Sequence, residues 1–319
     1  MSTTADILAL RTRRRRRDRL FIVVCLAAAG LSVIILGVLL TSIVAQGHGH
    51  LDKRFLTSPP SRRPANAGIH PAFWGSVWVC IVCALSAVPL GVGTAILLEE
   101  FRPKGRWLSR LHGFVQLNIT NLAGVPSIVY GILGLTVFVE MFGLLGTAND
   151  PAWELGTTED WYYLRLPFGR GVLAGGLTLM LVVLPVVIIA SQEALRAVPH
   201  SLRHGALALG STRWQVVRRI TLPAAMPGIM TGTILAMSRA IGEAAPILVI
   251  AGIVYIAFTP GHLMDNFTVM PLQIFNWAGR PQEEFHRLAA AGILALLALL
   301  LTFNAVAVVI RYKFQKCLS

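Results

Sequence analysis

Two opposite charges, Arg239 and Glu243, stand in the otherwise apolar segment 224–257. An ionised side chain at the centre of a bilayer costs at least about 2.5–3.5 kcal/mol, so each must face protein or water. Their spacing of four residues places both on one face of a helix, where each offsets the desolvation of the other. The planar guanidinium of Arg239 suits a tetrahedral oxyanion, with Glu243 holding it in place. The pair therefore predicts an anion site, or else a buried ion pair that only locates the helix.

Neutral donors near this pair could complete an anion site. Ser238 and Thr231 lie on the same segment, although such hydroxyls often bond to the backbone of their own helix. Asn121 precedes Pro126 in the apolar segment 114–145, and a polar helix interrupted by proline is typical of a cavity wall. Either these side chains and Arg239 line a single pathway for the anion, or the span at 114–145 begins later than its hydropathy suggests.

The composition requires an integral membrane protein. The 319 residues are 55% hydrophobic and 13% charged, with a mean hydropathy of +0.67, whereas soluble domains contain about 25% charged residues. A helix of about 20 apolar residues crosses a bilayer, and hydrocarbon offers no partner for an unpaired backbone N–H or C=O group. We therefore predict an all-α membrane protein with six transmembrane helices, at 20–45, 72–98, 114–145, 171–190, 224–257 and 288–310.

The net charge is +13, and the basic residues lie mostly on one side of the predicted spans. Most Lys and Arg residues lie in segments that share a side: 11–19, 99–113, 191–222 and 311–319. The positive-inside rule then places both termini in the cytoplasm. An Arg-rich run directly before a first span is more typical of contact with membrane lipid than with nucleic acid. We divide the chain into a basic tail 1–19, a first span 20–45, an outer loop 46–71, a core 72–311 and a tail 312–319.

The sequence carries no signature of an enzyme. It has no phosphate-binding loop, no H-E-x-x-H and no G-x-S-x-G motif. Cys80 and Cys83 have the spacing of a redox pair, but they lie in an apolar span, where packing is the simpler explanation. His48, His50 and Asp52 form only a weak candidate for a metal site. We predict that the chain is not an enzyme and has no catalytic residue, metal or cofactor of its own.

The basic segment 191–223 predicts a helix, a glycine bend and a second helix. Leu202, Ala206 and Leu209 follow the helical period, Gly210 interrupts it, and the second helix is expected to end at Pro223. One face of this element is apolar. It must be buried in the lipid interface or in a groove of a cytoplasmic protein.

This segment resembles a known motif. Ala206, Gly210, Ile220 and Leu222-Pro223 have the spacing of the E-A-A-x3-G-x9-I-x-L-P coupling motif in permease subunits of ATP-binding-cassette importers. The resemblance implies the type I importer permease fold and a short coupling helix that binds a separate ATPase. The coupling residues that it implies are His204, Gly205, Ala206, Leu209, Gly210, Trp214, Ile220, Leu222 and Pro223. Because His204 replaces the family's glutamate and Gly205 its first alanine, docking would depend more on Ala206, Leu209, Gly210 and Trp214.

A narrower resemblance covers residues 72–311. The segment 239–246, with stretches at 88–100, 121–135 and 184–199, looks like the A-type permease of the high-affinity phosphate importer, rather than the C-type. It implies a multi-pass subunit of the bacterial inner membrane that moves inorganic phosphate past Arg239 and Glu243. The partners implied are a C-type permease that forms a heterodimer with this chain, two ATPase subunits that bind ATP and Mg, and an extracytoplasmic phosphate-binding protein. The alternatives are transport of sulfate or molybdate, and a membrane sensor or assembly subunit without a substrate.

Overall fold

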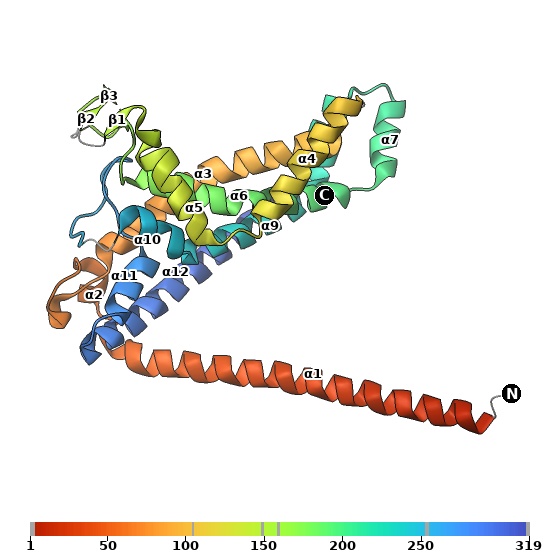
Figure 1. Cartoon of the computed structure of the whole chain (residues 1–319), viewed down its shortest axis with the longest axis horizontal. Coiled ribbons are helices and arrows are strands. Elements are labelled where there is room, and N and C mark those ends of the chain that lie inside the picture. The colour runs from red at the N-terminus through yellow and green to blue at the C-terminus, as the bar shows by residue number, and fades with distance from the viewer. Residues whose placement is uncertain (1–3, 104, 148–149, 158–159, 253–254, 317–319) are drawn as a thin grey trace.

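The computed structural model describes residues 4–103, 105–147, 150–157, 160–252 and 255–316 (Figure 1). Long helices form a bundle with α7 (His200–Ala208) at one end, which we call the α7 end, and short strands toward the other, the strand end. Five helices are long and apolar enough to cross a membrane, or six spans if α4 and α5 are counted as one. The prediction of a helical membrane protein is confirmed.

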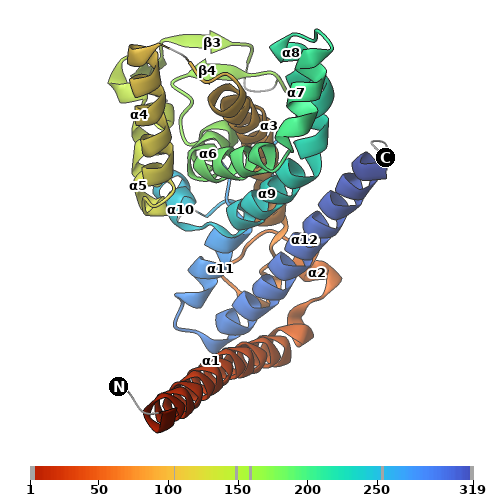
Figure 2. The same ribbon diagram turned by 90° about the vertical axis from the view of Figure 1, so that its right-hand side faces the viewer.

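Four of the predicted spans correspond to long helices, all of which extend past the C-terminal end of the apolar run. They are α1 (Thr4–Gly47), α3 (His70–Glu100), α6 (Val172–Arg196) and α12 (Glu283–Lys316). Figure 2 shows α6 in the middle, with α3, α4, α5, α9 and α10 around it. In contrast, α1 meets the bundle near Gly47, which packs on Ala290 of α12, and the side chains of residues 17–42 are exposed (Figure 1). This apolar surface must be covered by lipid or by another chain.

The predicted span 114–145 is not one continuous helix. The chain forms α4 (Arg106–Leu122), then α5 (Ser127–Gly134) and the π-helical turn η3 (Leu135–Val139), with a bend of 109° between them. Pro126 disfavours helical geometry at the residue before it and has no N–H to donate. The Tyr130 hydroxyl donates to the Leu122 carbonyl at 2.7 Å and so satisfies one of the unpaired acceptors at the end of α4.

The predicted span 224–257 is interrupted as well. It comprises α9 (Leu222–Gly242) and α10 (Ala245–Ala251), and Glu243 between them leaves the helix with φ −78° and ψ 112°. In a continuous helix the ring of Pro246 would clash with the Gly242 carbonyl four residues earlier, and no N–H could reach that carbonyl. The proline therefore forces the break between α9 and α10. Hydropathy alone does not reveal it, because the segment is apolar on both sides of the break.

At the α7 end, the expected stop at Pro223 is wrong. Helix α8 (Arg213–Val216) continues through the π-helical turn η5 (Val217–Thr221) directly into α9. The Leu222 N–H donates to the Val217 carbonyl five residues back, so the wider turn accommodates the proline, which lies in the first turn of α9. Helix α6 also continues to Arg196, so the loop is shorter than 191–223.

The strand end contains short elements that the sequence did not predict. Two antiparallel pairs join β1 (Gly146–Thr147) with β2 (Asp150–Pro151) and β3 (Trp153–Leu155) with β4 (Leu164–Leu166). Hydrogen bonds from the backbone and hydroxyl of Thr157 hold the pKa of Asp160 below its usual value and order the turn nearby. The remaining elements are η1 (His48–His50), α2 (Lys53–Thr57), η2 (Pro64–Asn66), η4 (Met141–Gly143) and α11 (Met270–Ala278).

The principal core lies where α3, α6 and α9 meet. Val79 and Cys83 of α3, Val183 of α6 and Met237 of α9 are buried in one cluster. Gly228 allows close approach of α9 to α6, because a Cβ there would lie 2.8 Å from the Cβ of Ala194. The small residues of α9 therefore form a packing seam, as expected for membrane helices.

Candidate functional site

Helix α7 is a separate short helix because a proline precedes its first residue and a glycine turn follows its last turn. Pro199 at its start has extended geometry, and Gly210 at its end has φ +83°, a conformation that only glycine adopts without strain. The N–H of Ser211 donates to the Ala206 carbonyl and that of Gly210 to the Leu207 carbonyl. These two bonds form a Schellman motif, which ends the helix and turns the chain into α8.

The predicted coupling residues of this region divide into an inner and an outer set. Ala206 is buried, whereas Leu209 is 89% and Trp214 56% exposed, and His204 and Gly205 are exposed as well. Trp214 lies beside Phe101, with ring centroids 6.4 Å apart. Two large apolar side chains therefore project from the α7 end, as on a surface that binds another protein.

Ile220, Leu222 and Pro223 have a different position. They belong to the continuous helix that joins α8 to α9, and Leu222 packs on the buried cluster that contains Leu98 and Leu195. A displacement of α7 and α8 would therefore reach α9 through a helix without a break.

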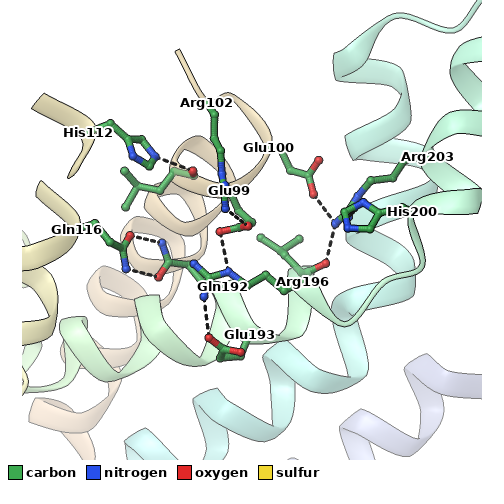
Figure 3. Close-up of polar contacts among 12 residues, drawn as sticks. Glu99, Glu100, Arg102, His112, Gln116, Gln192, Glu193, Arg196, His200 and Arg203 are labelled. Carbon is green, nitrogen blue, oxygen red and sulfur yellow. Dashed lines mark hydrogen bonds and ion pairs between the residues drawn. The ribbon is translucent and has the colours of Figure 1, made fainter. Parts of the chain in front are cut away.

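A network of polar side chains binds α7 to the bundle (Figure 3). Nη2 of Arg203 donates to the Glu100 carboxylate at 2.7 Å and to the Leu195 carbonyl at 2.6 Å. The side chains of this ion pair are only 13% and 11% exposed. His200 completes the contact, with Nδ1 at 3.2 Å from Nη1 of Arg203.

Further polar contacts join α3, α4 and α6 at this end. Glu99 accepts hydrogen bonds from Arg196 at 3.0 Å and from Arg102 at 2.6 Å. The side-chain amides of Gln116 in α4 and Gln192 in α6 bond each other twice, at 2.8 and 3.1 Å (Figure 3). The sequence pattern did not single out these residues. The signal that could have found them is the pair Glu99-Glu100 after the apolar run 72–98, together with Arg196 and Arg203 after the run 171–190.

Arg239 and Glu243 do form an ion pair, between Nε and Oε1 at 3.0 Å. They do not share a continuous helix, since Arg239 lies in the last turn of α9 and Glu243 follows its end. Met237, two residues before Arg239, is buried with Val79 and Cys83, well inside α3. The pair therefore lies partway along the bundle, at a break in a membrane-spanning segment, with Glu243 17% and Arg239 56% exposed.

The two interrupted spans contact each other beside this pair. A Cβ on Gly131 of α5 would lie 2.8 Å from Cα of Pro246 at the start of α10. The break before α5 and the break at Glu243 are thus brought into one region. Interrupted helices at membrane depth are tolerated where protein or a water-filled cavity covers their free backbone groups.

Of the other predicted pathway residues, Ser238 and Thr231 form hydrogen bonds with partners other than Arg239. The single proton of the Ser238 hydroxyl is shared between the Ile234 carbonyl and Oδ1 of Asn304 in α12. The Thr231 hydroxyl donates to the Pro227 carbonyl and accepts from Arg311. Asn121 is exposed near the end of α4. Among the described residues no hydrogen bond joins these side chains to Arg239, and their role in the pathway stays a prediction.

A helical membrane bundle with two interrupted spans and a short separate helix at one end is an architecture expected of a membrane-embedded transport subunit. The chain belongs to the family of binding-protein-dependent transport system inner membrane components, which matches residues 87–316. The predicted permease fold and inner-membrane location are thereby confirmed, whereas the placement of both termini in the cytoplasm stays a prediction.

Among relatives, the chain is 33% identical to the probable ABC transporter permease protein YqgH of Bacillus subtilis (strain 168), covering 88% of this chain and 82% of the relative. It is 30% identical to the phosphate transport system permease protein PstA of Yersinia pestis, over 94% and 92% of the two chains. A bacterial alginate ABC transporter has a similar fold, with a TM-score of 0.63, 16% identity and coverage of 92% and 94%.

Proposed function

We propose that this chain is the A-type permease subunit of an ATP-driven importer of inorganic phosphate. Supporting this are the relatives named as phosphate transport permeases and the presence of Arg239, Glu243 and Pro246 in the segment that resembles them. A C-type permease would complete the membrane unit as a heterodimer. The phosphate-binding protein would deliver substrate to the strand end, and two ATPase subunits holding ATP and Mg would bind at the α7 end.

One observation carries the substrate role: Arg239 has hydrogen-bonding capacity that its carboxylate partner does not use. Only Nε of Arg239 bonds to Glu243, and the side chain is 56% exposed, against 17% for Glu243. Among the described residues no other hydrogen bond to this guanidinium is found, which leaves both terminal nitrogens for a ligand. A cation at this depth does not face hydrocarbon, so it faces water or the second permease. Two parallel donors fit a tetrahedral oxyanion.

Glu243 would balance this site when it is empty. An anion binds against the attraction already present between Arg239 and Glu243, which keeps its affinity low enough for release. Helix α9 connects the Arg239 site to the α7 end through η5 and α8. Closure of the ATPases would move α7 and, through α9, expose the site alternately to the two sides.

The test is uptake by the complete importer in proteoliposomes. Arg239→Gln should assemble normally and abolish uptake of labelled phosphate. Arg287→Gln is the matched control, because Arg287 is similarly exposed, at 51%, and also pairs with a glutamate in an i,i+4 relationship. Normal uptake by Arg239→Gln would refute the role of this site.

Competition assigns the substrate. Excess unlabelled phosphate should suppress uptake, while sulfate and molybdate should not. Suppression by sulfate or molybdate would indicate another oxyanion importer, and no uptake of any oxyanion by the wild-type complex would favour a sensor or assembly subunit.

A further inference from the structure

Two adjacent glutamates at the end of α3 bind two different helices (Figure 3). Glu99 pairs with Arg196 of α6, and Glu100 pairs with Arg203 of α7. Successive residues on a helix point about 100° apart, which lets one turn of α3 reach both neighbours. The contact between Glu100 and Arg203 spans 103 positions of the chain and is the one that reaches α7.

The covalent connections of α7 are poor candidates for transmitting force to α3. On one side, the non-helical residues 197–199 join it to α6; on the other, the turn at Gly210 leads to α8. Helix α7 also contacts α8 and η5, which continue into α9. Movement of α7 therefore reaches α9 directly, whereas α3 has Arg203 as its polar connection to α7.

This connection is stiff because the ion pair is largely buried. With 13% and 11% of the two side chains exposed, water screens the charges little. The Leu195 carbonyl accepts a further hydrogen bond from the same Arg203 nitrogen and fixes its direction. Separation of the pair would leave a buried charge uncompensated, so Arg203 and Glu100 move as one unit.

We propose that the ion pair between Arg203 and Glu100 makes α3 follow α7, so that α3 and α9 move together when the ATPases close. Both are positioning residues, since neither contacts the substrate. The common core of Val79, Cys83 and Met237 then carries the joint movement to Arg239. This inference rests on the importer function proposed above and adds the element that couples ATP hydrolysis to the substrate site.

The decisive variant replaces both charges with apolar side chains of similar volume, Glu100→Leu with Arg203→Met. Such replacement of a buried pair usually preserves folding. The complete importer should still assemble and hydrolyse ATP, but phosphate transported per ATP should fall at least about fivefold, the lower range for coupling between sites. The single variants Glu100→Ala and Arg203→Ala should each lower this ratio without adding to each other's effect in combination.

The matched control is Glu193→Gln, which removes an exposed pair within α6 and should leave the ratio unchanged. A normal ratio in the Leu/Met double variant, or multiplicative effects of the two alanine variants, would overturn the proposal. If the wild-type importer moves no phosphate, the function proposed above fails instead, and a readout independent of substrate is needed.

Spin labels at Leu85 of α3 and Leu235 of α9, both exposed, supply that readout. They are placed in the complete complex after alanine replacement of Cys25, Cys80 and Cys317, while the buried Cys83 is retained because it belongs to the common core. In the otherwise wild-type complex, nucleotide should leave the separation of the labels unchanged, because both helices move together. The Leu/Met double variant should show a nucleotide-dependent change. An unchanged separation in that variant, or an equal change in both complexes, would contradict the link.

Discussion

The side chains of Arg239 and Glu243 meet at 3.0 Å across the end of α9, so the ion pair joins a helical residue to one outside the helix. A movement of α9 relative to α10 changes this contact directly. In an unbroken helix the two side chains would keep a fixed spacing, and the pair could not respond to the state of the bundle. The break at Pro246 thus makes the charge balance of the site dependent on conformation.

Glu243→Gln should convert the site into one that holds its anion too tightly. The carboxylate competes with substrate for the guanidinium, and a hydrogen bond to a charged group contributes about 1.5–3 kcal/mol. We expect about tenfold more labelled phosphate retained by the purified complex, together with slower turnover. Equal or weaker retention would show that the carboxylate does not compete with the anion.

Gly210→Ala should weaken the coupling between the ATPase and this permease, whereas Gly205→Ala should not. Open space surrounds both glycines, but Gly210 has φ +83° and Gly205 lies inside α7 with helical geometry. A side chain in the left-handed region costs about 1–2 kcal/mol, while alanine in a helix interior is favourable. Copurification of the ATPase and ATP hydrolysis stimulated by the binding protein measure the outcome. Similar behaviour of the two variants would argue against the glycine turn.

Gly228→Val should destabilise the packing of α9 on α6. A Cβ at Gly228 would lie 2.8 Å from that of Ala194, and overpacking of this kind costs about 1–3 kcal/mol. The control is Gly93→Val in α3, where nothing lies within 4 Å of an added Cβ. Thermal unfolding of the purified complex in detergent should show a lower midpoint only for Gly228→Val. An equal decrease in both would indicate a loss unrelated to this seam.

Gln192→Leu should destabilise the complex more than the double variant with Gln116→Leu. Gln192 is 2% exposed, and it takes part in both hydrogen bonds between the two side-chain amides. A buried polar group left without a partner costs about 1–3 kcal/mol, and removal of both partners can be nearly neutral. Thermal unfolding of the wild-type complex, the single variant and the double variant tests this order. A double variant that is less stable than Gln192→Leu would contradict the pairing.

The elements of the site that sequence determined are those governed by neighbouring residues. Gly210 marked the end of α7 because only glycine tolerates its backbone geometry, and the spacing of Arg239 and Glu243 placed them within reach of each other. The apolar runs located the spans, since burial in a bilayer depends on local composition. Pro126 and Pro246 are also evident in the sequence. However, hydropathy is averaged over a window longer than a helix break, so it predicts two continuous spans where the structure has interrupted ones.

Tertiary structure decided which distant residues share a contact. Glu100 and Arg203 are 103 positions apart, and Gln116 and Gln192 are 76 apart. Nothing in their local sequence selects these partners, because many charged and amide residues lie near the same end of the bundle. The packing of α3 and α4 against α6 sets which side chains meet. For the same reason Ser238, adjacent to Arg239 in sequence, turned to Asn304 of α12: one residue further along a helix faces another neighbour.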